Sequence, residues 1–123
     1  MIENINEYQK EAHTTADYPV PEMIKSWSFQ ESDSMNYVYP ALGLAEEAGE
    51  VAGKFAKAVR DNGGVIDEDR KAEIIKELGD VCWFVAEIAT CLEIDMSLIL
   101  QKNLDKLASR KARGVIHGSG DNR

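Results

Sequence analysis

Apolar side chains recur at helical spacing along most of the chain, and the only prolines stand at positions 19, 21 and 40. The clearest pattern follows the acids of residues 66–69, which suit the positive end of a helix dipole. Apolar positions then alternate spacings of four and three residues, as one face of a helix requires. We therefore predict a long helix with a buried stripe, formed by Ile74, Leu78, Val81, Val85, Ile88 and Leu92.

Three further helices are predicted around this one. The first covers about residues 2–13. A second, rich in Ala, Glu and Lys, covers residues 36–60 and ends at two glycines, Gly63 and Gly64. After a break near residues 93–95, the last helix runs from about residue 97 to 112.

The remaining segments are predicted to be irregular. Residues 17–39 mix prolines, serines and aromatics, which is typical of a loop. Three glycines in the last ten residues predict a flexible tail over 114–123. The predicted fold is all-α, a helical bundle of about four helices. It forms a single domain over residues 1–123, with its core at 36–113.

Length and composition limit the class of protein. A chain of 123 residues with 44% apolar content builds one core. We expect a cytoplasmic protein with no membrane segment, because the N-terminus lacks a signal-peptide pattern and no apolar run approaches ~18 residues. Cys82 and Cys91 lack metal-ligand spacing and are expected as buried thiols.

The charge balance argues against a nucleic-acid scaffold. There are 22 acidic and 14 basic residues, a net charge of −8, which repels a polyanionic duplex. Because of this repulsion we expect no stable nucleic-acid binding. A small phosphorylated ligand can still bind, because bound cations can reverse the local field.

Two groups of acids stand on consecutive predicted helices. Glu46, Glu47 and Glu50 fall within roughly 100° of arc on the first of these helices. On the next helix the acids fall within roughly 60°, directly beside the apolar stripe. If the helices form an antiparallel hairpin, an ExxE pair faces an ExxD pair. The second group consists of Glu73, Glu77 and Asp80.

Four converging carboxylates repel one another unless a divalent cation neutralises them. Oxygen ligands suit magnesium, with manganese as a substitute, and the lack of His/Cys pairs argues against zinc. Magnesium is commonly shared with substrate phosphates, so such a site points to phosphate chemistry. Acids at this spacing also commonly form a solvated helix face, and geometry alone leaves both readings open. Gly43, Gly49 and Gly79 are each costly inside a helix, and Gly49 and Gly79, which lie within or beside the acid pairs, suggest close helix approach there.

The strings LGLAEEAGEVAGKFAK and EIIKELGDVCWFVAEIA resemble the MazG-like nucleotide pyrophosphohydrolases of the all-α NTP pyrophosphatase superfamily. The resemblance covers residues 36–113. It implies magnesium-dependent cleavage of nucleoside triphosphates between the α and β phosphates, giving monophosphate and pyrophosphate. The implied metal ligands are Glu47, Glu50, Glu77 and Asp80. Glu46 would orient or deprotonate the attacking water.

The resemblance also indicates substrate-binding residues. Asn103, Lys106 and Arg110 share a helix face and would contact sugar or phosphates, although basic residues also suit a helix C-terminus. Lys54 would meet a phosphate, or instead pair with Glu50. Phe84 would pack against base or sugar. The aromatics before the second helix would stack the base, or else belong to the core or an interface; they are Trp27, Phe29, Tyr37 and Tyr39.

The helices carry more apolar surface than one hairpin buries, so a homodimer or homotetramer is expected. The main alternative is a noncatalytic helical interaction module with an acidic face. A calcium store would want an EF-hand loop, and a di-iron bundle would want Glu-x-x-His motifs. A dimeric dUTPase-like enzyme would want a longer chain. Canonical, damaged and signalling nucleotides all remain compatible with the sequence.

Overall fold

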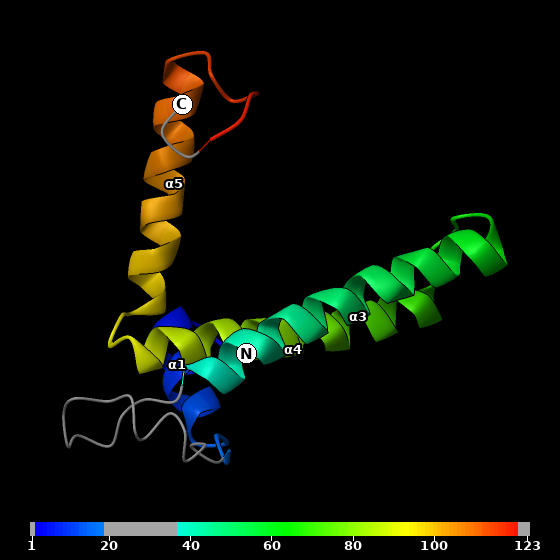
Figure 1. Ribbon diagram of the computed structural model, residues 1–123, viewed down its shortest axis with the longest axis horizontal. Coiled ribbons are helices and arrows are strands. Elements are labelled where there is room, and N and C mark those ends of the chain that lie inside the picture. Colours follow the sequence, from blue (N-terminus) through cyan, green and yellow to red (C-terminus); the bar gives the residue numbers. More distant parts are fainter. Residues whose placement is uncertain (1, 19–36, 121–123) are drawn as a thin grey trace.

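The computed structural model describes residues 2–18 and 37–120, and every regular element in these ranges is an α-helix (Figure 1). The predicted all-α fold class is confirmed. Each predicted helix is present, and its ends lie within a few residues of the expected positions. The helices are α1 (Ile5–His13), α3 (Val38–Asn62), α4 (Glu68–Cys91) and α5 (Met96–Ala112).

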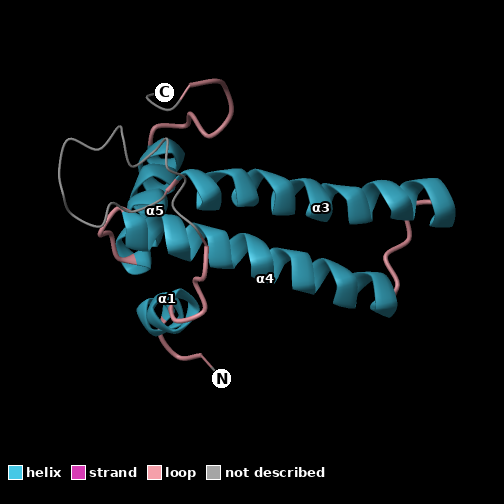
Figure 2. Cartoon of the chain, turned by 60° about the horizontal axis from the view of Figure 1, so that its bottom comes forward, coloured by secondary structure: helices cyan, strands magenta, loops and turns pink. Residues whose placement is uncertain are grey.

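The two long helices α3 and α4 form an antiparallel hairpin (Figure 2). Gly63 ends α3 in the left-handed conformation, with a φ of 57°, which glycine adopts without strain. The Gly64 N–H then donates to the carbonyl of Ala58 (3.0 Å). Asp67 is the N-cap of α4, because its carboxylate accepts a hydrogen bond from the Arg70 N–H (2.8 Å). The turn between the helices is therefore specified at both ends by local chemistry.

One glycine sets the closest approach of the two helices. A Cβ at Gly43 would overlap the ring of Phe84, so α3 contacts α4 here through bare backbone. Gly49 and Gly79 face open space, and the prediction of close approach at these two positions is wrong. The acids beside them are therefore not held by a glycine-mediated contact of the two helices.

The short helix α1 crosses α4 near its C-terminal end and builds a small core there. The indole N–H of Trp83 donates to the Ala12 carbonyl (3.2 Å) and to the Thr15 hydroxyl (2.8 Å). Burial of apolar surface and these hydrogen bonds together fix α1 on α4. The buried members of the core are Ala12, Ala86, Ala89 and Met96, with Ile5, Tyr8, Trp83 and Val85 packed around them.

Side chains of α1 also cap the start of α5. The Met96 N–H donates to the side-chain oxygen of Gln9 (2.8 Å), and the Ser97 N–H donates to that of Asn6 (2.9 Å). Gln9 also donates to the Ile94 carbonyl (2.9 Å). The residue that precedes α5, Asp95, makes no side-chain cap. The first N–H groups of α5, which have no partner within the helix, are thus satisfied by α1.

Much apolar surface stays exposed, because α5 extends away from the hairpin and contacts mainly α1 (Figure 1). The predicted stripe on α4 is therefore only partly buried: Leu78 is 46% exposed and Leu92 54%. Cys91 is buried as expected, but Cys82 is exposed, because α1 and α3 leave part of α4 open. None of the described helices is long and apolar enough to cross a membrane.

We predict that Gln9→Leu lowers the free energy of unfolding by about 1–3 kcal/mol, because it leaves the Met96 N–H and the Ile94 carbonyl without a side-chain partner. Urea denaturation followed by circular dichroism measures the change. Glu11→Gln, an exposed change on the same helix, is the matched control. Equal stability of the two variants would contradict capping of α5 by α1.

Candidate metal centre

Three acids from the two hairpin helices meet across the seam. Glu47 on α3 and Glu77 and Asp80 on α4 each offer a carboxylate oxygen, and these oxygens lie within 4.8 Å of one another. Glu47 and Glu77 are half-buried and Asp80 is exposed. The antiparallel pairing of α3 with α4 therefore places one member of the ExxE pair against both members of the ExxD pair.

The convergence is electrostatically unfavourable by itself. Burial, followed by repulsion from Asp80, Glu50 and Glu77, raises the pKa of Glu47 above the ordinary glutamate range. Such a shift means that the ionised form of Glu47 is destabilised where it stands. A divalent cation would remove this penalty, and three carboxylate oxygens from two helices fit a hard ion such as magnesium or manganese.

Glu46 and Glu50 are neighbours of this trio but do not belong to it. Both side chains are exposed, and both add to the negative field that raises the pKa of Glu47. Of the four predicted ligands, the structure thus brings three together and leaves Glu50 one turn further along α3. The roles predicted for Glu50 as a ligand and for Glu46 as a base stay predictions.

Lys54 provides positive charge at the edge of the trio. Its ammonium lies 3.0 Å from a Glu77 oxygen and 3.7 Å from a Glu73 oxygen. Hydrogen bonding to Glu77 raises the pKa of Lys54. Lys54 thus pairs across the seam with α4 and not with Glu50, the alternative partner on its own helix. The reason is that Glu73 and Glu77 both lie on the face of α4 next to Lys54. The sequence places Glu73 on the same arc as Glu77 and Asp80, but no role was predicted for it.

Aromatic rings close the seam on the other side of the acids. Phe84 is buried and packs edge-on against Trp83 (ring centroids 4.9 Å apart) and tilted against Tyr39 (5.9 Å). Tyr39, which is 46% exposed, stacks on Tyr18 at 4.8 Å. Tyr18 was missed by sequence reasoning, because nothing in its local sequence indicates a contact with α3. Trp27 and Phe29 lie outside the described residues.

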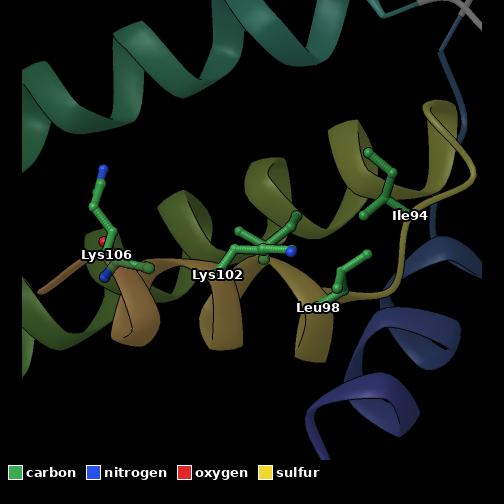
Figure 3. A pocket seen from close by; sticks show the side chains of 6 residues that line it. Ile94, Leu98, Lys102 and Lys106 are labelled. Atoms are coloured by element: carbon green, nitrogen blue, oxygen red, sulfur yellow. The ribbon is translucent and has the colours of Figure 1, made fainter. Parts of the chain in front are cut away.

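Two of the three predicted residues of α5, Asn103 and Lys106, line a separate groove. A groove of about 580 Å³ is bordered by Lys102, Asn103 and Lys106, with an apolar floor (Figure 3). Figure 3 shows Leu98, Lys102 and Lys106 on successive turns of α5, with Ile94 in the connection that precedes the helix. Lys102 was also missed, although its spacing of four from Lys106 indicates the shared face.

Arg110 occupies a different environment from Asn103 and Lys106. It is only 7% exposed, and it donates from Nη2 to the Gly120 carbonyl (3.4 Å) in the C-terminal segment. A direct role for Arg110 in substrate binding stays a prediction, as do the roles of the groove residues.

Comparison with known proteins identifies a family and a relative. The family described as the MazG nucleotide pyrophosphohydrolase domain matches residues 40–115, which include α4 and α5 and nearly all of α3. The chain is also 43% identical to the Gene 37 protein of Mycobacterium phage L5 over 120 residues, which are 98% of this chain and 99% of that protein. That protein's name states no activity. No solved structure matches the chain.

We predict that Glu47→Gln stabilises the metal-free protein, raising Tm by about 3 °C, because it removes one charge from a repelling trio. Magnesium should stabilise the wild type by about 2.7 kcal/mol at a hundredfold excess over Kd, and the variant much less. Differential scanning calorimetry with and without magnesium measures both effects, with Glu68→Gln, an exposed acid at the start of α4, as control.

The same experiment has a defined pH dependence. Because the pKa of Glu47 is raised, protons compete with the cation for this carboxylate at a higher pH than they would at an ordinary glutamate. Stabilisation by magnesium should therefore be complete at neutral pH and decline as the pH falls toward that pKa. A variant less stable than wild type without magnesium, or equal stabilisation of both by magnesium, would contradict the repelling trio.

Proposed function

The chain belongs to the MazG nucleotide pyrophosphohydrolase family, and from this premise we propose that it is a magnesium-dependent hydrolase of nucleoside triphosphates. The bond cleaved is the one between the α and β phosphates, giving a nucleoside monophosphate and pyrophosphate. One observation carries the proposal: three carboxylate oxygens from α3 and α4 converge within 4.8 Å inside the region that matches the family. Its location, the cytoplasm, stays a prediction.

Each acid has a proposed task. Glu47, Glu77 and Asp80 would hold the cation, and Glu50 would complete the set by a side-chain rotation from its exposed position. When bound, magnesium would offset negative charge on the phosphate oxygens and on the leaving pyrophosphate. Glu46, exposed at the margin of the trio, would accept the proton of the water that attacks the α phosphorus.

Lys54 has a task that follows from its present partners. Its ammonium now offsets the charge of Glu77 and Glu73. A cation that takes Glu77 as ligand weakens this pairing, because the two positive charges compete for one carboxylate. Lys54 would then turn to the substrate phosphates. The lysine would thus stabilise the acid cluster before the ligands arrive and contribute to substrate binding afterwards.

The nucleoside would extend along the seam toward the aromatic rings. Tyr39, Gly43 and Glu47 follow i, i+4, i+8 spacing on one face of α3. On α4, Phe84 stands one turn after Asp80 on the acid-bearing face. A base beside Tyr39 gains stacking energy, whereas the opposite direction leads to the charged group of Lys54 and Glu73. Phe84 is buried and would contact the Tyr39 ring from the interior of the seam, not the base itself.

We also propose that the working form contains a second copy of the chain. Leu100, Leu104 and Leu107 fall within roughly 60° on α5 and are 46%, 60% and 45% exposed. A leucine stripe of this kind on a protruding helix is characteristic of helix pairing. Asn103 and Lys106 lie roughly 70° and 130° around α5 from the middle of the stripe, so an assembly through the stripe would bring them to its margin, toward the acids of a neighbouring copy.

The alternative function is a noncatalytic interaction module whose acidic face binds a basic partner. A solvated acidic face would avoid mutual repulsion by spreading its charges. The close trio, with the raised pKa of Glu47, favours a cation site instead.

We predict that the wild type releases pyrophosphate from one or more nucleoside triphosphates only with magnesium or manganese. Asp80→Asn and Glu50→Gln should each lower kcat by about a hundredfold or more, because each change removes negative charge at the cation. A panel of ribo- and deoxynucleotides, with coupled detection of pyrophosphate, tests this. Glu68→Gln serves as the control for a lost surface charge. Folded protein that releases no pyrophosphate from any nucleotide would favour the interaction module.

We predict that Leu104→Glu shifts the protein to smaller species in sedimentation velocity, because it puts a charge in the middle of the leucine stripe. Lys102→Gln lies on the opposite face of α5 and should leave the sedimentation coefficient unchanged. A wild type that sediments as a monomer at tens of micromolar would refute assembly through this stripe.

A further inference from the structure

A buried carboxylate lies beyond the acid trio, and the proposed chemistry does not use it. Glu87 is 1% exposed, although acids are rarely buried without compensating partners. It stands on the same face of α4 as Asp80, seven residues or roughly 10 Å further along the helix. It is too distant to share the same cation, so its burial calls for another explanation.

The partners of Glu87 come from α1 and from the segment that follows it. The Tyr18 hydroxyl donates to Glu87 Oε1 at 2.6 Å. His13 Nδ1 lies 3.0 Å from Glu87 Oε2 and 3.2 Å from Glu87 Oε1, and the His13 side chain is 56% exposed. Cys91 Sγ lies 3.7 Å from the Tyr18 hydroxyl. One carboxylate thus connects α4 to two residues at the end of the N-terminal segment.

Protonation states agree with this arrangement. Burial, followed by the hydrogen bond to Glu87, raises the pKa of Tyr18 well above its usual range, so its phenol stays a donor. Burial likewise raises the pKa of the Cys91 thiol, which therefore stays neutral. The Glu87 carboxylate thus accepts from the neutral Tyr18 phenol and faces the His13 imidazole, while the neutral Cys91 thiol contacts the Tyr18 hydroxyl.

We propose that Glu87 is a positioning residue for the nucleotide site, acting through Tyr18 on the exposed ring of Tyr39. Tyr18 stacks on Tyr39 at 4.8 Å and meets Trp83 edge-on at 6.5 Å. A phenol with a fixed hydroxyl has a fixed ring, so Glu87 determines where Tyr39 is supported. This inference rests on the proposed function, in which Tyr39 borders the base.

The test separates positioning from general stability. Glu87→Leu removes the acceptor and keeps apolar volume, whereas Tyr18→Phe removes the donor and keeps the ring. Both should raise KM for the nucleotide, about tenfold and about threefold, with kcat within about threefold of wild type, when assayed well below Tm. Glu87→Gln keeps an acceptor and should restore KM to near the wild-type value. Glu11→Gln is the control. A purely structural role would lower Tm and leave KM unchanged.

A second readout does not depend on activity. The chain has two tryptophans, so Trp27→Phe leaves Trp83, which contacts the Tyr18 ring and α1, as the sole emitter. In that background, Glu87→Leu and Tyr18→Phe should shift the Trp83 emission to longer wavelength. Unchanged emission and unchanged KM in both variants would overturn the proposal. If the wild type hydrolyses no nucleotide, the proposed function fails and the positioning role fails with it, whereas the emission still tests the contact of Tyr18 with Glu87 separately.

Discussion

The pairing of α3 with α4 is the constraint on which the rest of the molecule depends. It brings together Glu47, Glu77 and Asp80, which repel one another, and it holds them although the pKa of Glu47 is raised as a result. The stability of the pairing comes from elsewhere, from the glycine turn at Gly63 and from the contact of Gly43 with Phe84. Contacts on either side of the acids therefore hold an unfavourable charge cluster in place, and the proposed cation would neutralise it.

The N-terminal helix links the hairpin to the rest of the chain. Through Gln9 and Asn6 it caps α5, and through Tyr18, just beyond its end, it reaches the aromatic rings beside the acids. A nine-residue helix thus determines both the direction of α5 and the support of Tyr39. Leucines of α5 stay exposed within the described part of the chain, and in the proposed assembly a second copy would cover them.

Local signals made much of this predictable. The 3.6-residue period, the acids around Asp67 and the glycines after Asn62 define the long helices, and the pairing of an ExxE with an ExxD motif follows from the short turn. Long-range contacts were not predictable: the exposure of Leu78 and Leu92 depends on the direction of α5, and that direction depends on side-chain caps. The Tyr18 to Glu87 bond joins residues 69 apart in sequence, and no periodic pattern encodes it.

The most direct measurement is anomalous scattering from a crystal grown with manganese, which replaces magnesium at oxygen sites and scatters strongly. We expect an anomalous peak at bonding distance from carboxylate oxygens of Glu47, Glu77 and Asp80. Added nucleoside triphosphate with a non-hydrolysable α–β bridge should place its phosphates on that peak and its base toward Tyr39. Manganese bound elsewhere, or nowhere, with the three carboxylates still converging, would contradict the central claim.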